Sequence, residues 1–151
     1  MTHDDAMQTL LKISSKIDFF ENLRDEEIKE LILDVKMVSY KEGEIIFKEG
    51  DTETEHLYYL LRGKISIDKY INDLKNLQSR ITTIDEPSLF GEMRFFTGEP
   101  RSATVESLDD RTLVIQLKFQ HFVEDNALSI FYRNVICELS NKISKMNDLY
   151  C

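Results

Sequence analysis

The chain has 151 residues, a net charge of −9 and 42% hydrophobic residues. A chain of this length buries about 68 to 70% of the surface of its unfolded form, enough for one core without disulfide or metal cross-links. Composition therefore excludes a largely disordered protein, and no apolar run reaches the roughly 20 residues of a membrane-spanning helix. Residues 1–5 include Asp4 and Asp5 and are atypical of a signal peptide, and the two cysteines, Cys137 and Cys151, suit a reducing compartment. We expect one cytoplasmic domain over residues 1–151.

Residues 1–35 carry the pattern of two N-terminal helices. Four apolar residues recur at helical spacing and predict one helix with a single apolar side; they are Leu10, Ile13, Ile17 and Phe20. Asp25 is predicted to cap a second helix, with Glu26 and Glu27 near the positive end of its dipole.

From about residue 36 to residue 117 the period of the apolar residues changes to two, which is typical of β-strands. Ile45 and Phe47 alternate with polar neighbours, as do Ile65 and Ile67. Further strands are predicted at residues 57–61, 79–85, 103–107 and 112–117, separated by glycine-containing turns. The pattern predicts a mainly β fold with flanking helices, an antiparallel jelly-roll barrel.

The helical period returns in residues 118–151, where we expect a hinge and a long C-terminal helix. A heptad seam is formed by Tyr132, Ile136, Leu139, Ile143, Met146 and Tyr150. It spans fewer than three heptads, so two interpretations stay open. The helix pairs with a second copy of the chain, or it lies along its own barrel.

Residues 90–105 combine three features that suit a ligand with both a sugar and a phosphate. Gly91 allows close approach of the backbone at the start of a short helical turn, whose N–H groups favour an anion. Glu92 is an acceptor in the same turn and therefore suits a hydroxyl group. The planar guanidinium of Arg101 can bind two phosphate oxygens at once.

This segment, Phe-Gly-Glu-Met-Arg-Phe-Phe-Thr-Gly-Glu-Pro-Arg-Ser-Ala-Thr-Val, resembles the phosphate-binding cassette of the cyclic nucleotide-binding domain family. That family includes catabolite activator-type regulators and the regulatory subunits of cyclic-AMP-dependent protein kinase. The resemblance extends over about residues 10–145. It includes the glycine-spaced hairpin at residues 40–51, the next hairpin at 57–67 and the entry helix at 20–31.

The resemblance implies a sensor domain that binds a cyclic nucleotide. It implies that Glu92 accepts a hydrogen bond from the ribose 2′-hydroxyl and that Arg101 pairs with the cyclic phosphate. The remaining ligand-binding residues that it implies are Phe90, Gly91, Met93, Ser102 and Ala103. Ser102 favours cyclic AMP by analogy with bacterial regulators, and cyclic GMP stays open. The C-terminal helix is expected to close over the base, with base contacts from Tyr132, Arg133 and Asn141.

Two features of the cassette leave its details open. Arg94 stands where the family prefers a small residue, so it either points outward, adds a second positive group or obstructs the site. The outward orientation is favoured, because a helical turn presents most side chains away from its N-terminal amides. Phe95 and Phe96 are expected to move against the helices near Phe119 when the ligand binds.

Other classes of function find less support in the sequence. His3, His56 and His121 lack the close spacing of metal ligands, and no nucleophile motif is present, so we expect neither an enzyme nor a cofactor. We also expect no nucleic-acid partner, because the chain is acidic and leaves no room for a helix-turn-helix. The expected partners are a second copy or an unidentified effector. The alternative is a degenerate cyclic nucleotide-binding fold that serves only protein interaction.

Overall fold

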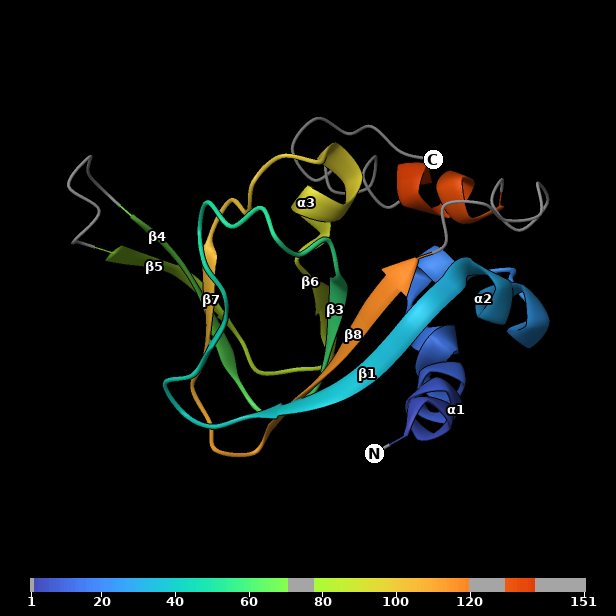
Figure 1. The fold of residues 1–151 in the computed structure, drawn as a ribbon, viewed down its shortest axis with the longest axis horizontal. Helices are drawn as coiled ribbons and strands as arrows, with labels where there is room; N and C mark the ends of the chain where they lie inside the picture. Colours follow the sequence, from blue (N-terminus) through green and yellow to red (C-terminus); the bar gives the residue numbers. More distant parts are fainter. Residues whose placement is uncertain (1, 71–77, 120–129, 138–151) are drawn as a thin grey trace. The chain divides into compact units, whose positions relative to one another are not determined.

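The computed structural model describes residues 2–70, 78–119 and 130–137. The chain divides into two compact units, which are described separately. One consists of Met1–Val35 with Phe119–Cys151, and the other of Lys36–Lys118 (Figure 1).

The first unit contains short helical elements and not the single long N-terminal helix predicted from the apolar spacing. These elements are α1 (His3–Ile13), the 3-10 turns η1 (Ser14–Lys16) and η2 (Asp18–Phe20), and α2 (Asp25–Leu31). The predicted stripe is therefore wrong as one helix, because extended backbone at Ile17 separates the two 3-10 turns. Arg24, and not Asp25, is the N-cap of α2, since the Glu27 carboxylate accepts a hydrogen bond from the Arg24 N–H at 3.0 Å.

Aromatic rings form much of the core of this unit. The centroid of the Phe131 ring lies 6.2 Å from the ring centroid of Phe19, 6.3 Å from that of Phe20 and 5.1 Å from that of Phe119. The buried side chain of Asn134 donates hydrogen bonds to two backbone carbonyls, those of Phe19 at 3.0 Å and Glu21 at 2.6 Å. Residues 130–137 are helical, and the side chains of Phe131 and Asn134 on this helix are buried.

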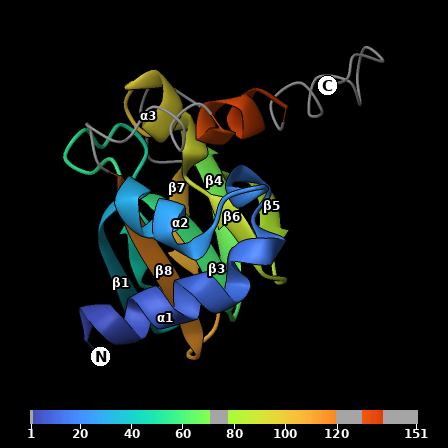
Figure 2. The same ribbon diagram turned by 90° about the vertical axis from the view of Figure 1, so that its right-hand side faces the viewer.

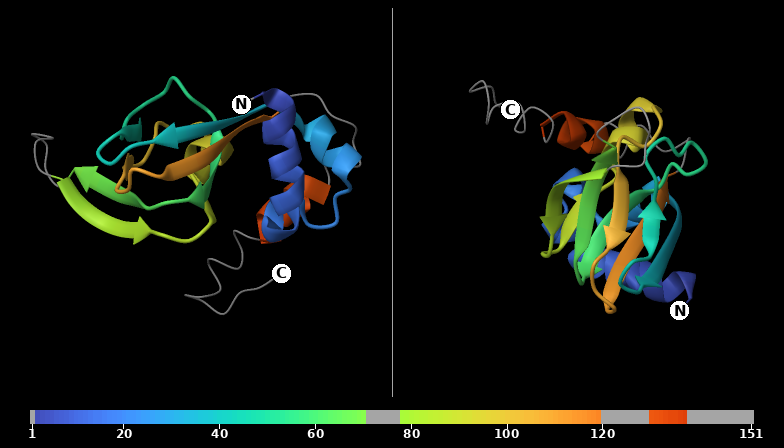
Figure 3. Two further views of the ribbon diagram at one scale, coloured as in Figure 1. Left: turned by 90° about the horizontal axis from the view of Figure 1, so that it is seen from below. Right: turned by 90° about the vertical axis from the view of Figure 1, so that its left-hand side faces the viewer.

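The strands form two four-stranded sheets, and most of them belong to the second unit. Their bounds are β1 (Ile32–Tyr40), β2 (Ile45–Phe47), β3 (Leu57–Arg62), β4 (Ile65–Tyr70), β5 (Gln78–Ile84), β6 (Ser88–Phe90), β7 (Thr104–Ser107) and β8 (Thr112–Phe119). The first sheet has the order β1-β8-β3-β6, visible as one layer in Figure 2. The second has the order β2-β7-β4-β5, and its β4–β5 hairpin extends to the left in Figure 1 and in the left-hand view of Figure 3.

These sheet orders correspond to the eight-stranded, double-sheet form of a jelly roll. The prediction of antiparallel strands with flanking helices is confirmed. The described strands do not close into one barrel, so the predicted barrel is corrected to two sheets. The sequence analysis also missed β6, because its three residues are too few to show an alternating pattern.

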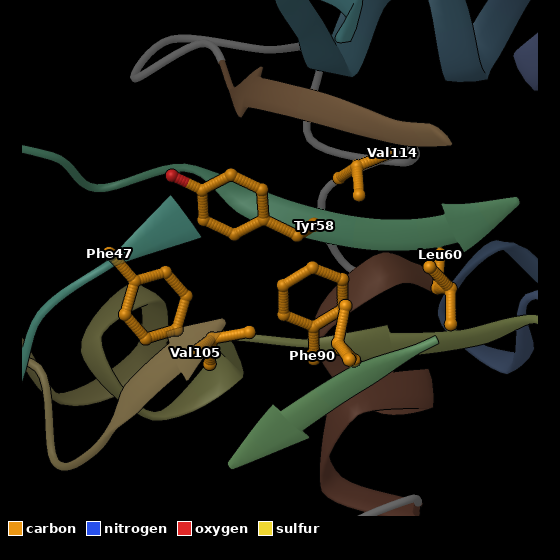
Figure 4. Packing of buried hydrophobic residues seen from close by; sticks show 7 residues of the cluster. Phe47, Tyr58, Leu60, Phe90, Val105 and Val114 are labelled. Atoms are coloured by element: carbon orange, nitrogen blue, oxygen red, sulfur yellow. The ribbon is translucent and has the colours of Figure 1, made fainter. Parts of the chain in front are cut away.

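The core of the second unit is a cluster drawn from strands of both sheets. It consists of Phe47, Tyr58, Leu60, Ile65, Phe90, Val105 and Val114. Figure 4 shows the aromatic rings of Phe47, Tyr58 and Phe90 gathered in this cluster. The rings of Tyr58 and Phe90 are stacked, with centroids 5.2 Å apart and planes inclined by 13°.

Two predictions about the C-terminal part extend beyond the described residues. The predicted long helix is described only at residues 130–137, and the seam beyond Ile136 lies outside the described ranges. No helix within those ranges is long and apolar enough to cross a membrane.

Candidate ligand-binding site

The candidate site is built around α3 (Glu92–Thr97), which follows β6 directly (Figure 1). Gly91 is the N-cap of α3 and has a φ of +76°, a left-handed conformation that L side chains rarely adopt. A Cβ atom at this position would lie 2.9 Å from the Tyr58 ring and 3.1 Å from Nη1 of Arg101. Gly91 therefore lets the backbone turn from strand to helix while it touches both the core and the arginine.

A cavity of about 240 Å³ opens beside this turn. Its lining includes six of the seven predicted ligand-binding residues, namely Phe90, Gly91, Glu92, Arg101, Ser102 and Ala103. The seventh, Met93, belongs to α3, but its side chain lies outside the described part of the structure. The fold thus brings residues from both ends of the cassette to one cavity.

Part of the cavity lining is apolar. It is supplied by Phe47, Ile67, Ile84, Leu89 and Val105, which the sequence analysis did not assign to the site. Ile67 and Ile84 come from the paired strands β4 and β5. The alternation of Ile67 with polar residues indicated a buried face, but it carried no signal that this face borders a cavity. The cavity therefore combines apolar and charged groups in its lining.

Arg101 is the most enclosed charged side chain of the cavity lining, at 2% exposure. Its Nη1 donates to the Gly91 carbonyl at 2.9 Å, and its Nη2 donates to the His56 carbonyl at 3.0 Å and to the Thr54 hydroxyl at 3.3 Å. Its Nε–H is buried and has no hydrogen-bond acceptor among the described residues. The guanidinium is thus held in place while part of its donor capacity remains unused.

The groups in direct contact with the Arg101 guanidinium are neutral polar groups and aromatic rings, while the carboxylates of Asp51 and Glu55 favour its charge from further away. Its guanidinium carbon lies 4.3 Å from the centre of the Phe47 ring and 5.3 Å from that of Tyr58, within cation–π range. Burial lowers the pKa of the Arg101 guanidinium from its ordinary value. Arginine nevertheless stays protonated in proteins. The site therefore holds a buried positive charge that an anionic ligand would stabilise.

The predicted outward orientation of Arg94 is wrong. Arg94 is only 8% exposed, and its side chain donates hydrogen bonds to four backbone carbonyls. These acceptors are Thr52 at 2.7 Å, Thr54 at 2.9 Å, Gly98 at 2.7 Å and Glu99 at 3.0 Å. These acceptors could not be predicted from the sequence, because they are main-chain atoms of two segments that only the fold brings together.

The predicted base contacts belong to the first unit of the chain, whereas the residues that line the cavity belong to the second. Tyr132 and Arg133 are exposed on the helix at residues 130–137, and Asn141 lies outside the described ranges. Phe95 is partly buried, and the side chain of Phe96 is not described. The base contacts and the hinge movement therefore stay predictions. In the described ranges, no three His, Cys, Asp or Glu side chains are grouped as metal ligands would be.

Comparison with known families assigns the fold and this cassette to one class. The family model described as "Cyclic nucleotide-binding domain" matches residues 37–124, which contain all of β2 to β8 and the cavity. The chain therefore belongs to the cyclic nucleotide-binding domain family. This confirms the resemblance inferred from the cassette and the preceding hairpins.

Two curated relatives come from Dictyostelium discoideum. The chain is 31% identical over 106 residues to a cAMP-dependent protein kinase regulatory subunit, a match that covers 70% of this chain and 32% of the relative. It is 26% identical over 106 residues to cyclic GMP-binding protein C, covering 68% of this chain and 4% of the relative. The chain thus spans a third or less of the length of either relative.

A solved structure supports the fold independently. The sensor domain of the transcriptional regulator DNR from Pseudomonas aeruginosa superimposes with a TM-score of 0.70 at 17% identity. The match covers 94% of this chain and 93% of that domain.

Replacement of Gly91 by alanine is expected to destabilise the fold more than the same change at Gly98. Both glycines have a left-handed φ, +76° and +72°, but an added Cβ meets no atom within 4 Å at Gly98. The left-handed conformation costs about 1–2 kcal/mol at either position. Overpacking against Tyr58 and Arg101 adds roughly 1–3 kcal/mol at Gly91 alone. Urea unfolding of the two variants measures this difference, and equal losses would contradict the close packing at Gly91.

Proposed function

We propose that the chain is a sensor domain that binds a cyclic nucleoside monophosphate in the cavity beside α3. The observation that carries this proposal is the environment of Arg101, a buried cation that lines the cavity and whose Nε–H has no acceptor among the described residues. A charge removed from water without an equally buried counter-charge is costly, and a bound phosphate would supply that counter-charge. In this proposal Arg101 binds the cyclic phosphate.

The mixture of polar and apolar groups in the cavity lining supports a nucleotide over a simple anion. Glu92 and Ser102 line the cavity together with Arg101, whereas Ile67 and Ile84 line it with hydrocarbon. In the proposed complex the Glu92 carboxylate accepts a hydrogen bond from the ribose 2′-hydroxyl. A nucleoside with a free 2′-hydroxyl and a cyclised phosphate then satisfies both polar groups.

The preferred base is proposed to be adenine, with guanine as the competitor. The two curated relatives are named for different nucleotides, one for cyclic AMP and the other for cyclic GMP. Ser102 follows Arg101 directly and borders the cavity with an exposed side chain. Its hydroxyl suits the cyclic AMP pattern of bacterial regulators, but it would also accept a bond from the guanine amino group.

We further propose that binding is read out by the C-terminal helix and not by catalysis. The helix at residues 130–137 buries Phe131 and Val135 on one face, while Tyr132 and Ile136 are 53% and 61% exposed on another. In the proposed switch this segment closes over the base and changes the apolar surface offered to a second copy or an effector. The ligand can bias the switch only through its different affinities for the two states.

Calorimetric titration of the purified chain with cyclic AMP and cyclic GMP tests the binding proposal. Replacement of Arg101 by alanine is expected to cost about 2 to 5 kcal/mol of binding free energy, because it removes one partner of a desolvated charge pair. This corresponds to a roughly 30- to several-thousand-fold loss of affinity. The exposed Arg111 provides the matched control, and its alanine variant should bind as the unchanged chain does.

Absence of binding by folded, ligand-free protein would refute the sensor function and would favour the degenerate interaction module. Equal affinities of the Arg101 and Arg111 variants would retain nucleotide binding but place it at another site.

The role of Glu92 is tested by the ribose 2′-hydroxyl. The unchanged chain should bind the 2′-deoxy form of its cyclic nucleotide roughly 10- to 100-fold more weakly, the value of a hydrogen bond to a charged group. In the Glu92→Ala variant this preference should fall to less than about threefold, because the acceptor has been removed. Competition binding of the two nucleotides measures both ratios. A preference that survives in the variant would assign the 2′-hydroxyl to a different acceptor.

The readout by the C-terminal helix is tested by hydrogen exchange. Amides of residues 130–137 should exchange more slowly when the nucleotide is bound, because closure adds packing against this segment. The Arg101→Ala variant at the same nucleotide concentration serves as the unliganded control. Unchanged exchange in chain known to be saturated with nucleotide would remove the switch while leaving the binding proposal intact.

A further inference from the structure

Arg94 uses most of its hydrogen-bonding capacity within the protein. A guanidinium carries five N–H groups, and Arg94 directs four hydrogen bonds to carbonyls, with its Nη2 also 3.7 Å from the Glu55 carboxylate. It borders the same cavity as Arg101. Four of its five N–H groups are thus committed to carbonyls, which leaves at most one for a phosphate.

The acceptors of Arg94 belong to two segments that are distant in the sequence. Gly98 and Glu99 follow the C-terminal end of α3, whereas Thr52 and Thr54 lie in the loop before β3. A single buried side chain therefore fastens this loop, residues 52–55, to the cassette helix. Charge-assisted hydrogen bonds to carbonyls are stronger than neutral ones, so this attachment is a firm one.

Thr54 joins the two arginines. Its carbonyl accepts from Nε of Arg94 at 2.9 Å, and its hydroxyl accepts from Nη2 of Arg101 at 3.3 Å. The backbone repeats the connection nearby, since the Arg101 N–H donates to the Asp51 carbonyl at 2.9 Å. Displacement of the loop would therefore withdraw acceptors that orient the Arg101 guanidinium.

We propose that Arg94 is a positioning residue that holds the loop at residues 52–55 against α3 and, through Thr54, orients Arg101 for the phosphate of the ligand. This inference rests on the proposed binding of a cyclic nucleotide. It assigns the two buried arginines different tasks. Arg101 contacts the phosphate, and Arg94 acts on the ligand only through the loop.

The test is a double-mutant cycle on Arg94 and Thr54, read by calorimetric titration with whichever of cyclic AMP and cyclic GMP binds more tightly. Arg94→Ala should weaken binding about tenfold. Thr54→Val, which keeps the shape and the carbonyl but removes the hydroxyl, should weaken it less. The double variant should bind no more weakly than Arg94→Ala, because both changes interrupt the same connection.

The Arg94→Lys variant tests whether ligand binding needs the planar guanidinium of Arg94 or only its positive charge. Lysine keeps the positive charge but has three donors and no planar fork, so it cannot reproduce the attachment to both segments. Its affinity should therefore resemble that of Arg94→Ala. Wild-type affinity in the lysine variant would overturn the inference, since charge alone would then suffice.

The remaining outcomes are also decisive. Additive losses in the cycle, or an alanine variant that binds like the Arg111→Ala control, would overturn the action through Thr54. If Arg94→Ala does not fold, as judged by thermal unfolding, the lysine and valine variants and their combination carry the test. Wild-type chain that binds neither nucleotide would defeat the proposed function itself. Binding that is lost in Arg101→Ala but unchanged in Arg94→Ala would defeat only this inference.

Discussion

The burial of the Arg101 guanidinium is the constraint around which the candidate site is organised. A cation at 2% exposure needs compensation from its surroundings, and here carbonyls, a hydroxyl and two aromatic rings provide it. Those groups come from β2, β3, the loop before β3 and the turn at Gly91, so the position of the arginine depends on much of the second unit. The jelly roll thus serves as a rigid frame that keeps one positive charge beside a cavity.

Gly91 connects this electrostatic requirement to the packing of the core. Its missing side chain allows the backbone to pass within contact distance of Tyr58, and its carbonyl then faces Nη1 of Arg101. The stack of Tyr58 on Phe90 fixes one side of this approach, while Phe47 lies under the guanidinium. The same rings therefore fill the core and support the charge, which explains why the site shares its wall with the hydrophobic cluster.

Local patterns allowed much of the fold and the cassette to be predicted from the sequence. The positions of most strands, though not of β6, followed from alternating apolar residues, and the Gly91-Glu92…Arg101 spacing placed its residues around one cavity. The parts that could not be predicted depend on main-chain atoms brought together by the fold. Arg94 was assigned to the surface because its four carbonyl acceptors have no side-chain signature. The prediction of one long N-terminal helix was wrong because the apolar spacing typical of a helix continues through two 3-10 turns.

The Arg101 side chain is already ordered without the ligand, and this affects how the binding free energy of the ligand would be used. A long side chain that is immobilised only on binding loses rotamer entropy, which reduces the affinity gained from its contacts. Arg101 is already fixed by three acceptors, so in the proposed function this loss is small. More of the free energy of the interaction with the phosphate can therefore contribute to a difference in affinity between two states of the chain. A cassette that is rigid at the phosphate is therefore well suited to drive a change elsewhere, because a switch can draw only on the difference in affinity between its states.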